Sequence, residues 1–120
     1  MATYQAASGA GQPAMDELVD STRAHLDGLP LQPKVLPHPY AFNPFSHNTR
    51  IDLETGYNEE ETKVIHETRK IFGEPDLRVS ATCVRVPLFR AHCVPMTFEC
   101  ERPITPRDVR EIYDRGLEFL

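Results

Sequence analysis

The sequence predicts an α+β fold, in which a small mixed or antiparallel sheet is covered by helices on one face. Three stretches repeat apolar residues every three or four positions, as amphipathic helices do. Between the second and third of them, two stretches rich in β-branched residues alternate apolar and polar side chains, as strands do. A chain of 120 residues builds one modest core, so we expect the other face of the sheet to be available for association.

The first helix is predicted over residues 13–26. Pro13 suits its first turn, apolar residues recur at helical spacing, and Gly28 ends it. Residues 28–50 contain five prolines and follow neither the helical nor the alternating period. They therefore predict an extended, proline-rich connection, with a short strand near residues 40–42.

The second helix is predicted between Asn58 and Gly73. Asn58 and Glu61 have the spacing of a capping box, which satisfies two backbone amides at a helix start, and Gly73 can end the helix. Alternation then predicts a strand over residues 78–86 and a second strand over residues 94–101, paired with the first around a turn.

The last helix is predicted to begin at Thr105-Pro106, with Asp108 accepting hydrogen bonds in its first turn. Its apolar residues have helical spacing, and four of them are expected to face inward: Val109, Ile112, Tyr113 and Leu117.

Composition excludes several function classes. Thirteen Lys and Arg against 18 Asp and Glu give a net charge of −5, which offers no field for nucleic acid, so we expect no nucleic-acid partner. The sequence has no targeting segment and no long apolar run, so we expect no membrane insertion. Cys83, Cys93 and Cys100 are odd in number and lack zinc-finger spacing, which indicates free thiols and no metal site.

Chemistry-bearing residues gather in the stretch ATCVRVPLFRAHC, residues 81–93. Strand pleating places Arg85 on the face opposite Val84, and Pro87 favours a bend that can bring His92 to the same side as Arg85. An arginine beside an imidazole suits a substrate that carries a carboxylate and needs a proton moved. Because such residues at strand ends are more often structural, this pattern alone is compatible with either a structural role or a role in substrate binding.

Several blocks of the sequence resemble the aspartate-semialdehyde dehydrogenase family. SATCVRVPLFRAH, residues 80–92, has the R-V-P-x-x-R-x-H arrangement of that family, and TYQAASGAG, residues 3–11, resembles a second block. FSHNT (45–49) and GYNEEETKVIHETRKIFGEPD (56–76) are similar to the family in the same order. The resemblance implies that residues 1–120 are a single partial domain, similar to the substrate and dimerisation domain in the middle of such an enzyme.

The family reduces β-aspartyl phosphate to aspartate semialdehyde with NADPH, through a thioester on a cysteine. For that reaction the resemblance implies that Arg85 binds the substrate carboxylate, that His92 is the acid/base group and that Gln5 orients the reacting group. It also implies that Glu60 and Lys63 contact substrate or phosphate.

The same resemblance places Ser8 and Gly9 in the loop that approaches the nicotinamide cofactor. Each of these weaker assignments has a plain alternative. Glu60 and Lys63 have the i, i+3 spacing of an ordinary solvated ion pair, and Ser8-Gly9 before a helix is commonly only a turn.

Two parts of the family pattern are missing. The sequence has no G-x-G-x-x-G after a strand, and the family's nucleophilic cysteine stands just upstream of the TYQA block. We therefore expect that the N-terminal cofactor domain and the nucleophile segment are absent, and that no NADP binds this chain alone. Cys83 is interpreted as a small core residue, and Cys93-Val94-Pro95 departs from the polar residue that usually follows the family histidine.

Whether the chain is an enzyme by itself therefore stays open. It is either the substrate-binding and dimerisation portion of the enzyme, inactive alone, or a non-catalytic structural subunit of a larger assembly derived from that domain. A split enzyme completed by another polypeptide is a third possibility. All three possibilities predict a protein partner, either a second copy or a larger assembly. The family implies that the chain is located in the cytoplasm or the plastid stroma.

Overall fold

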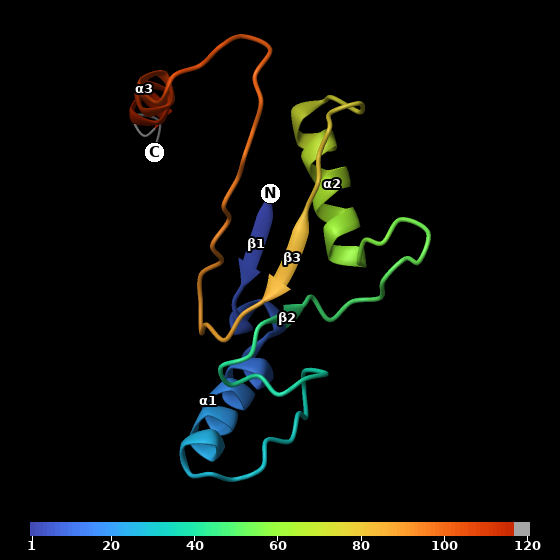
Figure 1. Ribbon diagram of the computed structural model, residues 1–120, viewed down its shortest axis with the longest axis vertical. Helices are drawn as coiled ribbons and strands as arrows, with labels where there is room; N and C mark the ends of the chain where they lie inside the picture. Colours follow the sequence, from blue (N-terminus) through green and yellow to red (C-terminus); the bar gives the residue numbers. More distant parts are fainter. Residues whose placement is uncertain (117–120) are drawn as a thin grey trace.

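A computed structural model describes residues 1–116 and shows helices beside a small open sheet (Figure 1). This confirms the predicted α+β class. The elements in chain order are strand β1 (Ala2–Gln5), 3-10 helix η1 (Ala7–Ala10), helix α1 (Gln12–Leu26), strand β2 (Phe45–Ser46), helix α2 (Glu59–Phe72), strand β3 (Thr82–Arg85) and helix α3 (Pro106–Gly116).

The sheet is mixed, with strand order β1-β3-β2. The central strand β3 runs parallel to β1 and antiparallel to β2, and Gln5 of β1 and Phe45 of β2 are both in register with Arg85. Partners in a parallel pair point to the same side of a sheet. Thr3 and Gln5 therefore share the buried face with Cys83 and Arg85.

The predicted strand at residues 94–101 is wrong. Strand β1, which the sequence analysis missed, lies where that strand would have paired with β3. The chain after His92 instead follows the other edge of β1, where Tyr4 and Cys93 exchange backbone hydrogen bonds of 2.8 and 3.1 Å. The Ala2 amide donates to the Pro95 carbonyl at 3.1 Å. Proline has no amide to return that bond, so a regular ladder does not continue there.

The connection after α1 packs back onto that helix. The Glu17 carboxylate of α1 accepts hydrogen bonds from three successive backbone amides, those of residues 34–36. The main apolar cluster forms beneath this loop from Ala7, Ala14, Met15, Leu18, Leu36 and Tyr40. The short strand expected near residues 40–42 is wrong: Tyr40 lies in this core, and the strand forms at Phe45–Ser46.

Helix α2 begins and ends as predicted. The Asn58 side chain accepts from the Glu61 amide at 2.8 Å, the Glu61 carboxylate accepts from the Asn58 amide at 2.9 Å, and Gly73 ends the helix in the left-handed conformation. The other Glu61 oxygen accepts from the backbone amide of Cys83 at 2.9 Å. One carboxylate thus joins the start of α2 to the central strand.

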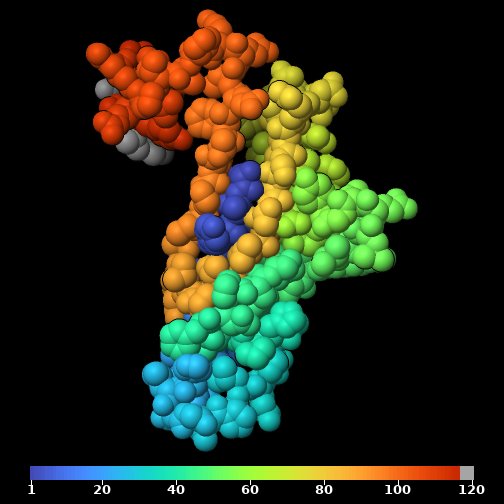
Figure 2. Space-filling view, in the orientation of Figure 1, coloured from blue at the N-terminus to red at the C-terminus, as the bar shows by residue number. Residues whose placement is uncertain are grey.

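Helix α3 stands apart from the rest of the chain (Figures 1 and 2). None of its described residues is buried, and Ile112 and Tyr113 are 60% and 61% exposed. The prediction that its apolar residues face inward is therefore wrong for Ile112 and Tyr113, and Leu117 lies outside the described residues. In residues 1–116, no helix combines the length and apolarity that crossing a membrane requires.

Candidate functional site

Arg85 is the centre of the site, at the end of the middle strand. It is only 3% exposed, and its guanidinium donates from Nη1 to the Ala6 carbonyl at 2.8 Å. Nη2 lies 2.9 Å from Nε2 of His47 and 3.5 Å from Oδ1 of Asn48. Within residues 1–116, its buried Nε has no hydrogen-bond partner. Burial lowers the pKa of Arg85, while the nearby Tyr40 and Glu60 oppose that change.

His92 lies close to Arg85 across Gly9. A Cβ built on Gly9 would be 3.5 Å from both His92 Nε2 and Arg85 Nη1. Gly9 therefore lies against both the imidazole and the guanidinium, and the structure brings the two groups of the R-V-P-x-x-R-x-H motif to one place.

Two backbone features turn His92 toward this place. Ala91, immediately before it, has φ of 69°, a left-handed conformation that non-glycine residues seldom adopt. The amides of Ala7 and Ser8 donate to the carbonyls of Leu88 and Phe89 at 2.8 and 3.1 Å, which holds the loop before His92 against η1. The Ala6 amide then donates to Nδ1 of His92 at 3.2 Å.

Gln5 and Ser8 lie beside this pair. Gln5 is buried, in register with Arg85, and its side-chain amide donates to Thr3 Oγ1 at 3.1 Å. The Ser8 backbone amide donates to the Phe89 carbonyl and is therefore not available to a ligand. The part of this loop that contacts His92 and Arg85 is Gly9.

Glu60 and Lys63 lie at the rim, on the first turns of α2. Their charged atoms are 3.6 Å apart, with the Lys63 side chain 56% exposed, so the pair itself adds little stability. The Glu60 charge nonetheless acts on both Arg85 and His47, and the Lys63 charge acts on His47. The structure thus places Glu60 near the guanidinium and near His47, and Lys63 near His47.

His47 and Asn48 are site residues that the sequence analysis did not single out. They follow β2, which pairs with the end of β3 and so carries them to Arg85. Burial and the Arg85 charge lower the pKa of His47, and Glu60 and Glu61 partly oppose this. The signal was present in the FSHNT block, which supported the family resemblance without any role being assigned to its residues.

The three cysteines differ in burial. Cys83 is buried in the central strand, and burial raises the pKa of its thiol, which disfavours the nucleophilic thiolate. Cys93 and Cys100 are exposed free thiols. Among the residues that the structure describes, no cluster of three or more His, Cys, Asp or Glu could hold a metal ion.

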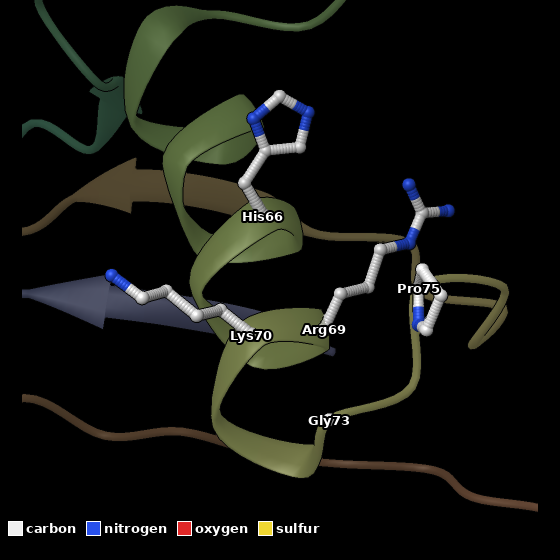
Figure 3. A pocket seen from close by; sticks show the side chains of 5 residues that line it. All are labelled: His66, Arg69, Lys70, Gly73 and Pro75. Carbon is white, nitrogen blue, oxygen red and sulfur yellow. The ribbon is translucent and has the colours of Figure 1, made fainter.

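A separate surface hollow of about 380 Å³ lies at the far end of α2, where Figure 3 shows Arg69 extending toward Pro75. Arg69 donates from Nε to the Leu77 carbonyl at 3.0 Å, and Lys70 lies in the last turn. Cations at a helix C-terminus offset its negative partial charge, so this hollow has a structural explanation.

Comparison with known proteins identifies relatives of this chain. Residues 1–118 match the family described as "Semialdehyde dehydrogenase, dimerisation domain". The aspartate-semialdehyde dehydrogenase of Synechocystis is 50% identical over 103 residues, covering 86% of this chain and 30% of that enzyme. The enzyme of Aquifex aeolicus is 42% identical over 114 residues, covering 93% of this chain and 33% of its own length.

Solved structures agree with these relatives. The crystal structure of aspartate semialdehyde dehydrogenase II from Vibrio cholerae matches with a TM-score of 0.71 and 41% identity, over 76% of this chain and 27% of that one. This chain spans about one third of the length of the curated relatives that it matches. A dimerisation domain implies association with another copy. The chain belongs to the aspartate-semialdehyde dehydrogenase family, and it matches that family's dimerisation domain.

Proposed function

We propose that this chain supplies the substrate-binding and dimerisation part of an aspartate-semialdehyde dehydrogenase, which reduces β-aspartyl phosphate to aspartate semialdehyde with NADPH. The convergence of Arg85 and His92 on Gly9 carries the proposal, because it puts an anion-binding group and an acid/base group within reach of one small molecule.

Arg85 binds the substrate carboxylate in this proposal. Its guanidinium is fixed by Ala6 and His47, so little side-chain freedom is lost when a ligand arrives. Its Nε donor is buried and unpaired among residues 1–116, and a carboxylate oxygen would satisfy it. Removal from water strengthens the attraction between the two charges.

His92 moves the proton. Its Nδ1 accepts from the Ala6 amide, so the neutral ring carries its proton on Nε2, the atom that faces Gly9. From there it can donate to the reacting group and take the proton back. Gln5, buried beside Arg85, orients the reacting group, and Glu60 and Lys63 contact the substrate or its phosphate from the rim.

In this proposal, this chain approaches only the nicotinamide end of NADP. The family resemblance gives Ser8 and Gly9 to the loop that approaches the nicotinamide, whereas the sequence has no glycine-rich turn after a strand to hold a pyrophosphate. When bound, the cofactor would supply the hydride. The dinucleotide and the nucleophilic cysteine would be held outside this sequence, so we expect no turnover by this chain alone.

Calorimetric titration of the purified chain with L-aspartate semialdehyde tests the proposal. We expect saturable binding that Arg85→Met weakens at least tenfold, because a charge-assisted contact is lost. Arg90→Met is the matched control, since Arg90 is exposed in the same segment and its replacement should leave the affinity unchanged.

Absence of binding to the unaltered chain would overturn the proposal and favour the non-catalytic structural subunit. A steady-state assay with aspartate semialdehyde, phosphate and NADP tests the second part. Turnover above background would show that this chain holds its own nucleophile and cofactor site, contrary to the expectation.

A further inference from the structure

We infer that His47 is a positioning residue for Arg85: as a neutral ring it accepts a hydrogen bond from the guanidinium and so fixes the group that binds the carboxylate. The inference rests on the proposed function, which gives the carboxylate to Arg85. It concerns a residue outside the R-V-P-x-x-R-x-H motif, brought to Arg85 by strand β2.

Hydrogen-bond chemistry determines the state of the ring. A guanidinium has only donors, so at 2.9 Å from Arg85 Nη2 the His47 Nε2 atom must be the acceptor and cannot carry a proton. The proton of the neutral ring is then on Nδ1, which lies 3.3 Å from Thr49 Oγ1. Thr49 can accept that proton through its hydroxyl oxygen, so the two contacts favour the same tautomer.

The surrounding charges agree with a neutral ring. Protonation at Nε2 would remove the acceptor and put a second cation against the buried guanidinium. Arg85 and Lys63 disfavour that protonation, while Glu60 and Glu61 favour it. Burial and Arg85 are the larger influences and lower the pKa of His47, so the ring stays neutral at pH 7.

The contacts of Arg85 occupy its two terminal nitrogens and leave one buried donor without a partner among residues 1–116. His47 and Asn48 engage Nη2, and Ala6 engages Nη1, while Nε stays unpaired among residues 1–116. His47 thus acts on the substrate only through Arg85. Without the ring acceptor, Nη2 would retain only the 3.5 Å contact with Asn48, and the guanidinium could swing away from Gly9.

Two measurements on the full chain test the inference. Long-range ¹H–¹⁵N NMR of the imidazole rings reports the tautomer of His47 directly. We expect the proton on Nδ1 and a bare Nε2, with Arg85→Met abolishing this preference. A proton on Nε2 in the unaltered chain would overturn the inference, whatever the binding assay shows.

Calorimetric titration with L-aspartate semialdehyde then separates positioning from simple packing. His47→Leu, which fills the space without an acceptor, should weaken binding about tenfold, whereas His47→Gln, whose side-chain oxygen can replace Nε2, should stay within about threefold of the unaltered chain. Equal affinity in the Leu and Gln variants would overturn the positioning role. His66→Gln, at an exposed position of α2, is the control and should not change the affinity.

Thr49→Val is a second variant for the case in which His47→Leu does not fold. It removes the acceptor for Nδ1–H but leaves the Arg85 contact, so His47 Nε2 should stay without a proton and the affinity should change little. A proton on Nε2 in this variant would show that Arg85 does not set the tautomer and would contradict the inference. Failure of the unaltered chain to bind L-aspartate semialdehyde would instead overturn the proposed function, and the NMR result would decide the His47–Arg85 contact alone.

Discussion

The buried guanidinium of Arg85 contacts a backbone carbonyl, an imidazole and an amide, and among residues 1–116 it forms no salt bridge with a carboxylate. Burying a charge without an opposite partner costs free energy. A structural role would be met better by an apolar residue of similar size. A ligand carboxylate would supply the missing opposite charge, which is why this residue favours a binding role.

The cysteines should differ sharply in reactivity. Cys83 is buried and its pKa is raised by burial, whereas Cys93 and Cys100 are exposed. We expect iodoacetamide at pH 7.5 to modify Cys93 and Cys100 first, with Cys83 reacting only after unfolding in urea. Peptide mass mapping over time measures this order. Early modification of Cys83 would show that its thiol is accessible and reactive in the folded chain, contrary to its burial.

His47 should make folding stability depend on pH. Burial and Arg85 lower its folded-state pKa below the ordinary value of 6.5, so the unfolded chain binds the proton more readily. The contribution of the neutral ring is therefore complete above about pH 6.5 and declines as the pH falls below it. Urea unfolding between pH 5 and 8 should show this loss.

The matched comparison is His47→Gln, which has no titrating ring and should flatten this part of the profile. His66→Gln, at an exposed position, should keep the slope of the unaltered chain. An unchanged slope in His47→Gln would show that another group causes the pH dependence.

The face of a strand on which a residue lies could be predicted from the sequence, because it depends on the strand pattern alone. Alternation correctly placed Arg85 opposite Val84, because pleating depends only on neighbours in the chain. Alternation could not show that Arg85 and Cys83 lie on the buried face, nor that His47 would reach Arg85, since both depend on strands far away in the sequence. Identifying His47 required the pairing of β2 with β3.

At the scale of elements, Glu61 connects helix α2 to the sheet. Its two carboxylate oxygens accept the backbone amides of Asn58 and Cys83, at 2.9 Å each, and the side chain is buried. One amide begins the helix and the other belongs to the central strand, so the same side chain sets the position of α2 against β3.

Glu61→Ala should lower the free energy of unfolding by about 2 kcal/mol, because it leaves two buried amides without an acceptor. Glu61→Gln keeps one acceptor oxygen and should cost about half as much. Urea unfolding at one fixed protein concentration measures both. Glu59→Ala, on an exposed position of the same turn, should stay within about 0.5 kcal/mol of the unaltered chain, and an equal loss there would contradict the role given to Glu61.

Helices with their own start and stop signals were predicted well, and strands that depend on a distant partner were not. The capping box and Gly73 define α2 locally, so its limits agree with the structure. Strand β1 is four residues long and pairs with residues about 80 positions away, so nothing near it identified it. Residues 94–101 alternate like a strand, but this stretch bonds to the edge of β1 at Pro95, and alternation alone does not specify a partner.

At the scale of the whole molecule, the chain is extended. Its radius of gyration is 18.0 Å, against about 14 Å for a compact domain of this length. Several large apolar side chains after His92 are exposed: Val94, Met96, Phe98, Ile104, Ile112 and Tyr113. Apolar surface on this scale marks an association site, which agrees with the family's dimerisation domain.

This surface predicts self-association that depends on α3. Ile112 is 60% exposed and contacts no buried core, so Ile112→Asp should leave the unfolding of the isolated chain within about 0.5 kcal/mol of the unaltered protein. If α3 packs against a second copy, the same change puts a charge into that interface and should weaken association at least tenfold. Sedimentation equilibrium across protein concentrations measures the mass relative to the 13.6 kDa monomer.

Arg110→Gln changes the net charge by the same amount at an exposed position of α3 and should associate like the unaltered chain. Identical dissociation constants for Ile112→Asp and the unaltered chain would mean that the copies meet through another surface, with the free edge and faces of the sheet as the next place to test.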